Sequence, residues 1–178
     1  MVTLKQITSA QTDDFAYVEG LLTTSFPLEE YRPLKEWKDF TDNNPLFRNN
    51  IIYDNDKRVG LMTIWDFDNF YYIEHFAVDA SLRNGGYGSK TLTLLEKLID
   101  KPIILEVEIP DNNTAIRRFE FYKRYQFTAW ENHSYVQPPY RESDSDLPMV
   151  IMCRGTLEED KDYDMVVKKI YKEVYNRV

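Results

Sequence analysis

The stretch from residue 83 to residue 90 has the residue types and the spacing of an anion-binding loop. Three glycines, Gly85, Gly86 and Gly88, lie between two cations, Arg83 and Lys90. Glycines remove the side chains that would keep a ligand away from the backbone. Where such a loop opens a helix, the unpaired amides and the positive end of the helix dipole attract phosphate. The sequence therefore predicts a phosphate or pyrophosphate site here.

Two common nucleotide motifs fit this loop poorly. A P-loop would need glycines at positions 84 and 89, where the chain has Asn84 and Ser89. A dinucleotide fingerprint would need a third glycine at Thr91, although Glu106 lies about where a ribose-binding acid would be. A glycine-rich turn that only reverses the chain is the plainer alternative.

A strand precedes the loop and a helix follows it. Residues 70–78 are aromatic and β-branched, which is typical of a strand. Apolar residues recur at helical spacing behind the loop, and residues 103–109 form another apolar run. Strand, helix and strand make a βαβ unit, so we expect parallel strands joined by a right-handed crossover. Because ligands of such units bind at the carboxyl ends of the strands, residues 76–78, the loop and residues 108–113 should surround one site.

The rest of the chain predicts further elements in a regular order. Thr12 is the expected N-cap of a helix that ends before Phe26. The Asp54–Lys57 segment has turn chemistry, so its flanking strands should form a hairpin. The remaining expected elements are strands at 4–7, 47–53, 58–66, 127–136 and 148–154, and helices at 33–41, after Asn113 and from 160 onward.

The C-terminal helix should carry a continuous apolar stripe. Its members are Tyr163, Val166, Val167, Ile170, Tyr171, Val174, Tyr175 and Val178. Such a stripe docks either on the protein's own body or on a second copy in a homodimer. We therefore expect a main domain at residues 1–155 and a helical extension at residues 156–178.

Composition limits the partners and the compartment. The chain has 178 residues, a formal net charge of −8 and a single cysteine, Cys153. An acidic surface repels nucleic acid and anionic membranes, and one cysteine suits a reducing compartment. We see neither a signal-peptide pattern nor an apolar run of membrane-spanning length, and two histidines with one cysteine predict no metal site. We expect a cytoplasmic protein.

Acids and tyrosines predict where a cationic substrate would bind. Glu29 and Tyr31 lie in the connection between the first two helices, and loops held by a rigid scaffold often carry binding residues. Tyr135 and Tyr140 add aromatic character further along the chain. Together with nearby acids they indicate a pocket for an amine, although a solvated loop is the plainer interpretation of residues 29–31.

The pattern Arg83-x-x-Gly86-x-Gly88 resembles the acyl-CoA pyrophosphate loop of the GNAT acetyltransferase superfamily. The Phe121-Tyr122 pair followed by Phe127 is similar to the next helix of that family, and the order of elements is similar over residues 3–154. Gln126 stands where the family usually has glycine. The resemblance implies an α/β (α+β) fold with a mixed, mostly antiparallel central sheet and a βαβ cofactor-binding unit.

The resemblance also implies roles for individual residues in acetyl transfer from acetyl-CoA to a primary amine. Backbone groups of Phe76, Ala77 and Val78 would bind the pantetheine arm, with Asn113 as a further contact. The pyrophosphate would be wrapped by the loop, namely Arg83, Asn84, Gly85, Gly86, Tyr87, Gly88, Ser89 and Lys90. Tyr122 would donate a proton to the departing thiolate.

The general base is expected among three carboxylates. Glu74 is our first choice, because a partly desolvated carboxylate on this strand would have a raised pKa. Glu106 and Glu108 on the neighbouring strand are rivals, and Glu106 is also a candidate for contacting the substrate. His75 should point to the face opposite Glu74, because side chains alternate along a strand.

Three functions stay open from the sequence. The first is an acetyl-CoA-dependent N-acetyltransferase that uses no metal. The second is a non-catalytic acyl-CoA sensor of the same fold. The third is a nucleotide-binding module that uses the loop for ATP or NAD.

Overall fold

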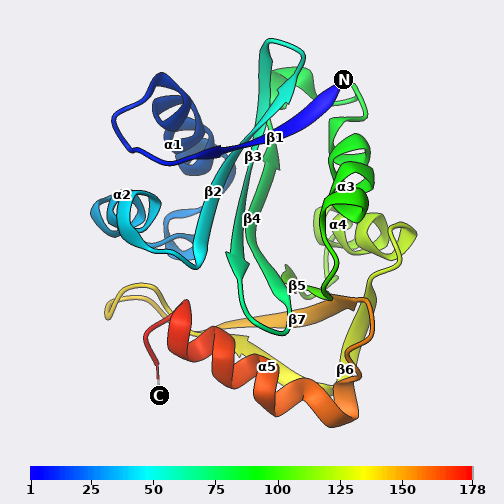
Figure 1. Cartoon of the computed structure of the whole chain (residues 1–178). Helices are drawn as coiled ribbons and strands as arrows, with labels where there is room; N and C mark the ends of the chain where they lie inside the picture. The colour runs from blue at the N-terminus through cyan, green and yellow to red at the C-terminus, as the bar shows by residue number, and fades with distance from the viewer. Residues whose placement is uncertain (178) are drawn as a thin grey trace. The chain divides into compact units, whose positions relative to one another are not determined.

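The computed structural model describes residues 1–177, which form five α-helices and seven strands in two compact units (Figure 1). The first unit comprises Met1–Asp68 and Ile73–Asp100, and the second comprises Asn69–Tyr72 and Lys101–Val178. Strand β4 (Tyr71–Val78) contributes residues to both units.

Neighbouring strands hydrogen-bond in the order β1-β2-β3-β4-β5-β7-β6. In the first unit, β1 (Val2–Ile7) pairs antiparallel with β2 (Phe47–Asp54), which pairs antiparallel with β3 (Lys57–Asp66). In the second unit, β7 (Leu147–Arg154) lies between β5 (Ile103–Glu108) and β6 (Thr128–Gln137) and is antiparallel to both. The expected mixed α/β class with a mostly antiparallel sheet is confirmed.

Three helices cover the strands of the first unit. Helices α1 (Asp13–Ser25) and α2 (Leu34–Asn43) lie on one face of β2 and β3, while α3 (Tyr87–Leu98) packs against β1 (Figure 1). Thr12 caps α1 as predicted, because its side chain accepts a hydrogen bond from the Phe15 amide. Apolar residues of α1 and the Trp37 ring of α2 are buried against the strands and form the core of this unit.

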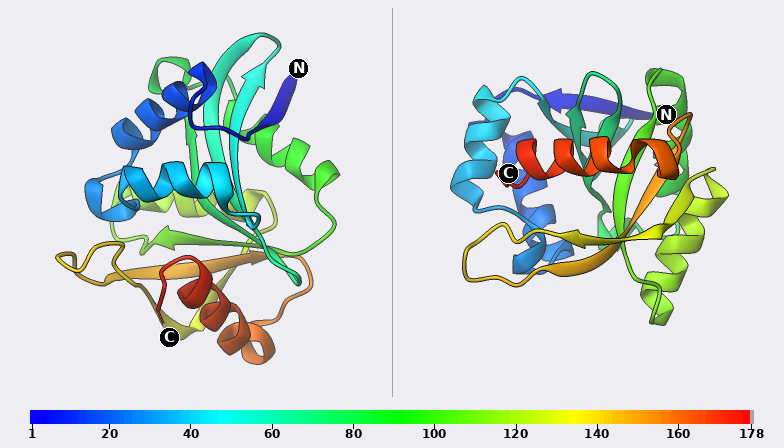
Figure 2. Two further views of the ribbon diagram at one scale, coloured as in Figure 1. Left: turned by 60° about the vertical axis from the view of Figure 1, so that its left-hand side comes forward. Right: turned by 90° about the horizontal axis from the view of Figure 1, so that it is seen from below.

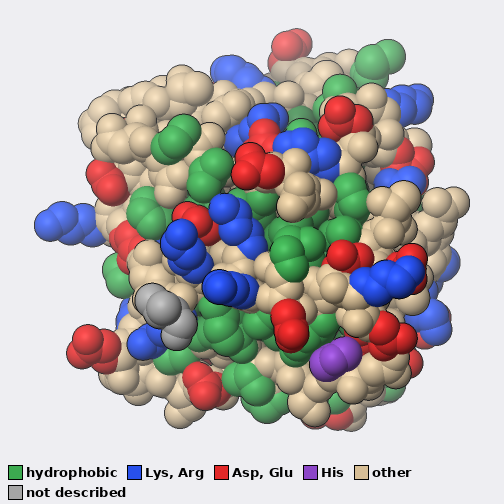
Figure 3. Space-filling view, turned by 60° about the horizontal axis from the view of Figure 1, so that its bottom comes forward, with side chains coloured by type: hydrophobic (Ala, Val, Ile, Leu, Met, Phe, Trp, Pro, Cys, Tyr) green, Lys and Arg blue, Asp and Glu red, His purple; other side chains and the backbone are tan. Residues whose placement is uncertain are grey.

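Two helices cover the strands of the second unit. Helix α4 (Asn113–Arg124) packs on β5, and α5 (Glu159–Glu173) runs along β6 (Figure 2). Val166 and Ile170 of α5 are fully buried, whereas Lys168 and Lys172 are exposed. Figure 3 looks onto this face, where basic side chains gather around the C-terminal half of the helix. Helix α5 therefore docks on the sheet of its own unit.

The C-terminal helix is shorter than predicted. It ends at Glu173, so Val174 and Tyr175 lie in the turn that follows, although both are buried. Apolar spacing could not locate this end, because the buried stripe continues past the last helical residue. The predicted stripe position Val178 lies outside the described residues.

Cys153 of β7 is buried, and its Sγ lies 3.8 Å from the Leu157 carbonyl oxygen. Burial raises the pKa of this thiol to about 11. Because the thiolate is the reactive form of cysteine, this side chain behaves as a small apolar core residue.

Within residues 1–177, no helix combines the length and the apolar character that crossing a bilayer requires. The same part of the chain contains no grouping of three or more His, Cys, Asp or Glu side chains that could hold a metal ion.

Candidate functional site

The loop between β4 and α3 is tightly bent. It begins with a short 3-10 turn at Ala80–Leu82, and both Asn84 (φ 75°) and Gly86 (φ 69°) adopt left-handed backbone conformations. A Cβ atom on Gly85 would lie 2.6 Å from the ring of Tyr87. A side chain at 85 would therefore displace the Tyr87 ring, and glycine is favoured at 86 for its conformation.

The first turn of α3 leaves backbone amides without helical acceptors. The Lys90 amide makes the first helical bond, to the Gly86 carbonyl at 3.0 Å, so the amides of residues 87–89 have no acceptor within the helix. The Lys90 ammonium folds back and donates to the Gly85 carbonyl at 2.9 Å. Lys90 thereby ties the loop together, and the exposed Arg83 is the cation that extends from it. This arrangement suits an anionic ligand.

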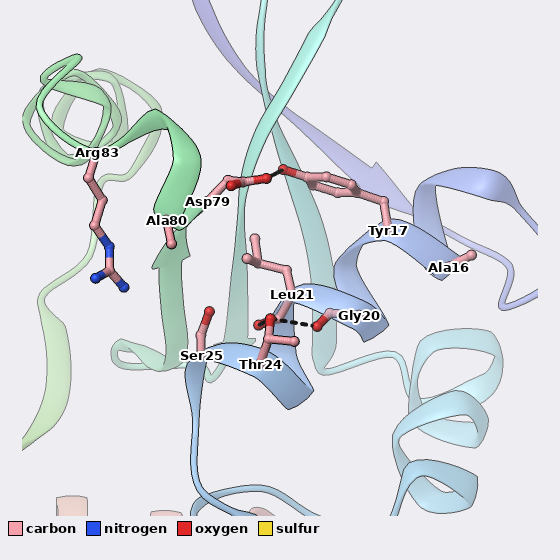
Figure 4. Close-up of a pocket in the computed structure, with 9 residues that line it drawn as sticks. All are labelled: Ala16, Tyr17, Gly20, Leu21, Thr24, Ser25, Asp79, Ala80 and Arg83. Carbon is pink, nitrogen blue, oxygen red and sulfur yellow. Dashed lines mark hydrogen bonds between the residues drawn. The ribbon is translucent and has the colours of Figure 1, made fainter.

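A cavity of about 420 Å³ lies beside the loop, between α1 and the end of β4 (Figure 4). The Tyr17 hydroxyl donates to Asp79 Oδ2 at 3.2 Å, and burial, with the neighbouring Asp79 charge, raises the pKa of Tyr17 to about 12. Thr24, Ser25 and Arg83 also line this space, and the guanidinium of Arg83 extends toward it from the loop side. The Tyr17 and Thr24 hydroxyls donate within the protein, to Asp79 and to the Gly20 carbonyl, so the Arg83 guanidinium is the cationic donor that this cavity offers next to the loop.

The end of β4, Phe76–Val78, is half-buried and precedes the loop directly. Gly60 of β3 lies so close that a Cβ atom there would be 2.5 Å from the Ala77 carbonyl oxygen. The Asp79 amide donates to the Val59 carbonyl at 2.9 Å. Close backbone packing against β3 therefore fixes the strand end where the loop begins.

Glu74 is part of a buried ion pair. Its side chain is 1% exposed, and it accepts hydrogen bonds from Arg32 Nη2 at 2.5 Å and from Trp65 Nε1 at 2.9 Å. Burial alone would raise the pKa of Glu74, but the Arg32 guanidinium and these hydrogen bonds hold it below its usual value. The expectation of a raised pKa is wrong, because the fold places Arg32, 42 residues away in the chain, against this carboxylate.

His75, the next residue of β4, is also buried. Its Nε2 lies 2.9 Å from the Glu30 carbonyl oxygen, and its Nδ1 lies 3.2 Å from the Thr63 hydroxyl. A carbonyl can only accept, so Nε2 carries the proton and Nδ1 accepts from Thr63. Burial lowers the pKa of His75, so the ring is neutral. Glu74 and His75 together fasten the α1–α2 connection to β4 through Arg32 and Glu30.

The two substrate candidates of this connection differ in exposure. Glu29 is exposed in a 3-10 turn at Leu28–Glu30, whereas Tyr31 is buried with 7% of its surface exposed. Glu29 could meet a ligand directly. Tyr31 supports the connection from the inside.

In the second unit, Tyr122 of α4 is buried, and its ring packs edge-on against Phe127 with centroids 5.5 Å apart. Burial raises the pKa of Tyr122 to about 12. The phenol is therefore protonated at neutral pH and can serve as a proton donor.

Glu106 lies at the centre of a tyrosine cluster in the second unit. Its Oε1 accepts a hydrogen bond from the Tyr135 hydroxyl at 2.5 Å, and its Oε2 accepts one from the Tyr175 hydroxyl at 2.9 Å. The Tyr72 hydroxyl lies 3.3 Å from that of Tyr175, and the Tyr140 ring packs on the Tyr175 ring with centroids 4.9 Å apart. The structure thus brings the candidates Glu106 and Tyr135 together, with Tyr175 as a third member.

Two further candidates of the second unit lie at its surface. Glu108 forms an exposed ion pair with Arg118 at 2.8 Å. Asn113 is the exposed first residue of α4, and the N-cap is its neighbour Asn112, whose side chain accepts from two amides of the first turn.

The sequence model of the Acetyltransferase (GNAT) family matches residues 5–127. The chain belongs to the GNAT family. A Bacillus subtilis (strain 168) relative, "Putative acetyltransferase YjbC", is 24% identical in a 152-residue alignment that covers 83% of this chain and 79% of the relative.

Solved structures of GNAT proteins are also similar. A "Putative acetyltransferase from GNAT family" from Bacteroides thetaiotaomicron is 45% identical, with a TM-score of 0.95 over 99% of both chains. Arabidopsis thaliana Naa50, solved with the bisubstrate analogue CoA-Ac-MVNAL, shares the fold at 20% identity and a TM-score of 0.60, over 87% of this chain and 99% of its own. Since the first likeness covers nearly the whole chain, it includes α5, which lies beyond the family match.

Sequence reasoning missed two members of these clusters in this GNAT protein. Arg32 stood out only as a base in a loop, and Tyr175 only as part of an apolar stripe. One signal was available for Tyr175, because a buried tyrosine hydroxyl needs a hydrogen-bond partner and a tyrosine in a valine- and isoleucine-rich stripe implies one.

Proposed function

We propose that this protein is an N-acetyltransferase that moves an acetyl group from acetyl-CoA to a primary amine. The observation that carries the proposal is the first turn of α3 in a chain of the GNAT family. Three amides there lack helical acceptors, and the turn follows Gly85 and Gly86 directly. No side chain at those two positions blocks a pyrophosphate from the backbone.

The pyrophosphate and the pantetheine arm of acetyl-CoA have matching groups in the first unit. The loop of residues 84–89 wraps the pyrophosphate, to which the amides of residues 87–89 and the Arg83 guanidinium donate, and the backbone of Phe76–Val78 binds the pantetheine arm. The Val78 amide polarises the thioester carbonyl. Asn113 is a further proposed contact of the pantetheine arm. The CoA moiety of the analogue named with Arabidopsis Naa50 supports this choice of ligand.

The transfer needs three proton movements. An ammonium must lose one proton before its nitrogen can attack the thioester carbon. Once the N–C bond has formed, the nitrogen loses a second proton as the C–S bond breaks, and the departing thiolate takes a proton. Tyr122 supplies the proton to the thiolate, because the buried phenol is protonated at neutral pH, and the second nitrogen proton restores the phenol.

We assign the carboxylate that receives the amine proton to Glu106 rather than to Glu74. The Glu74 carboxylate is enclosed and its charge is already paired with the Arg32 guanidinium, so the ammonium of an acceptor cannot pair with it. Glu106 is only partly buried, and neutral phenols hold its two oxygens in a defined orientation. A carboxylate held in this way can pair with an ammonium and then take its proton.

The proposed acceptor is a cationic primary amine of a small molecule or a peptide. A carboxylate beside the rings of Tyr135 and Tyr140 suits an ammonium, because cations bind both carboxylates and aromatic faces. The formal net charge of −8 favours the approach of cations over anions. Glu29 stays a predicted contact at the surface. Tyr31, which was also predicted to contact the amine, is buried and would support the connection behind Glu29.

Thermal unfolding with CoA, acetyl-CoA, ATP and NAD in turn tests the cofactor. A ligand that binds the folded protein raises the unfolding midpoint by mass action. We expect CoA and acetyl-CoA to raise it, and ATP and NAD to leave it unchanged. If CoA in high excess leaves the midpoint unchanged, the proposal is wrong.

A variant with an added negative charge tests whether CoA binds at the loop. Ser89→Glu adds an acid in the first turn of α3, where acids stabilise a helix, but its charge repels pyrophosphate. We expect it to fold and to lose the CoA-induced shift. Thr93→Glu is the matched control, because Thr93 is exposed on the same helix beyond its first turn.

An acetylation screen with spermidine, tyramine and the peptide Met-Val-Asn-Ala-Leu then tests the acceptor class.

A further inference from the structure

The two phenols that hold Glu106 come from distant parts of the second unit. Tyr135 belongs to β6, whereas Tyr175 lies in the turn that follows α5, 69 residues after Glu106. Each phenol reaches a different oxygen of the carboxylate, at 2.5 and 2.9 Å. Two hydroxyls from different parts of the chain therefore fix the plane of the carboxylate.

Both phenols act as donors. Tyr135 is 3% exposed and Tyr175 is 6% exposed. Burial, followed by the Glu106 charge, raises the pKa of each phenol well above its usual value, so both remain protonated. Tyr175 has one proton, which Glu106 accepts, so the Tyr72 hydroxyl is the donor in the 3.3 Å contact with Tyr175. Tyr72 thus donates to Tyr175, and Tyr175 donates to Glu106, which only accepts.

Helix α5 is anchored to β6 along its length, which fixes the position of Tyr175. At its start, the Glu159 carboxylate accepts the backbone amides of residues 131–133, where β6 leaves register with β7. Further along, Tyr163 and Tyr171 donate their hydroxyls to β6 carbonyls at 3.2 and 2.5 Å. Because these bonds hold both halves of the helix, the turn after it has a defined place.

We propose that Tyr175 is a positioning residue of the acetyl transfer, and that the C-terminal segment which carries it is a working part of the acceptor site. By donating to Glu106, Tyr175 keeps this carboxylate ionised and oriented toward the ammonium of the acceptor. The inference rests on the proposed function. It extends the site beyond residues 5–127, the part of the chain that the family model matches.

Among the described residues of the second unit, three tyrosines interact with Glu106, namely Tyr135, Tyr171 and Tyr175, and Tyr72 and Tyr140 adjoin Tyr175. Hydrogen bonds to the charged form of a carboxylate lower its pKa, so loss of one phenol donor raises that pKa.

The test compares Tyr175→Phe with Tyr163→Phe by a carboxyl-carbon NMR titration of glutamate-labelled protein, in which Glu106→Gln assigns the signal. Each variant loses one hydroxyl of the C-terminal segment, but only Tyr175 bonds Glu106. We expect the Glu106 titration to move up by about one pH unit in Tyr175→Phe and to stay in place in Tyr163→Phe. An unchanged titration in Tyr175→Phe overturns the proposal. Should that variant not fold, Tyr135→Phe gives the same test of the second donor.

Kinetics supply the functional half of the test. With the amine found by the screen, Tyr175→Phe should shift the acidic limb of the kcat profile upward by the same amount, with KM for acetyl-CoA unchanged. A shifted titration with an unshifted kcat profile would make the role structural and overturn the proposal. The CoA-induced rise in the unfolding midpoint should persist in this variant. If CoA causes no rise in the unfolding midpoint of the unaltered protein, the proposed function itself is rejected.

Discussion

At the scale of single residues, the chemistry depends on which groups keep their protons. Tyr122, Tyr135 and Tyr175 are phenols whose pKa is raised by burial, whereas Glu74 is held as a carboxylate by Arg32. Protonated phenols can donate, and the charge of an ion-paired carboxylate is already matched by its partner. Glu106 and Glu74 therefore differ in their partners. Protonated phenols donate to Glu106, whereas a guanidinium is paired with Glu74.

Tyr122→Phe should reduce kcat about 100-fold, because general acid catalysis typically contributes a factor of that order. The change removes one hydroxyl and keeps the ring that packs on Phe127, so the unfolding midpoint and the CoA-induced shift should be preserved. Steady-state kinetics with saturating acetyl-CoA measure the effect. Tyr125→Phe, three residues along the chain, is the control and should retain full activity. A Tyr122→Phe enzyme as fast as the unaltered one would remove Tyr122 from the mechanism.

At the scale of elements, the end of β4 depends on a glycine in β3. Gly60→Ala places a Cβ atom 2.5 Å from the Ala77 carbonyl, so we expect a loss of about 2 kcal/mol in the free energy of unfolding, as for overpacked interiors. Urea titration measures it. Gly20→Ala is the control, since a Cβ atom on Gly20 of α1 meets nothing within 4 Å. This helical site should gain about 0.5–1 kcal/mol, and equal effects at the two sites would contradict the argument.

The turn after α4 contains a strained residue. Gln126 adopts φ 65°, in the left-handed region that costs a non-glycine residue about 1–2 kcal/mol. Gln126→Gly should therefore stabilise the protein by about 0.5–1 kcal/mol after the extra entropy of glycine in the unfolded chain is subtracted. Gln126→Ala retains the strain and should give no gain. A thermal unfolding series that ranks alanine above glycine would refute this account.

At the scale of the whole molecule, buried ionisable groups make stability depend on pH. Burial lowers the pKa of His75 below its usual 6.5, so at lower pH the unfolded chain binds a proton that the folded chain excludes. The free energy of unfolding should therefore fall as the pH drops below about 6.5. A second fall should begin below 4.5, because the pKa of Glu74 is also lowered in the folded state.

Urea titrations at pH 7.5, 5.5 and 4 would measure both effects. His75→Gln should remove the first fall and keep the second. His133→Gln is the matched control, because His133 is exposed and should leave both falls in place. A loss of the first fall in His133→Gln would contradict the assignment to His75.

The sequence predicted the order of the helices and strands, because that order follows from local periodicity, caps and turns. Thr12, the glycine loop and the helix with Phe121-Tyr122 were all found in this way. Partnerships between distant residues were not, as Arg32 and Glu74 are 42 residues apart and Glu106 and Tyr175 are 69 apart. Only a folded chain brings them together, so the protonation of the buried acids could not be predicted from spacing.

The burial of Cys153 has a practical consequence for labelling. At pH 7 a thiol with a pKa of about 11 is ionised in only about one molecule in ten thousand. A maleimide dye would therefore react with a cysteine introduced at an exposed position such as Thr93 and spare the natural thiol. A single added cysteine near the loop would thus give a fluorescent reporter of CoA binding, without first removing the natural one.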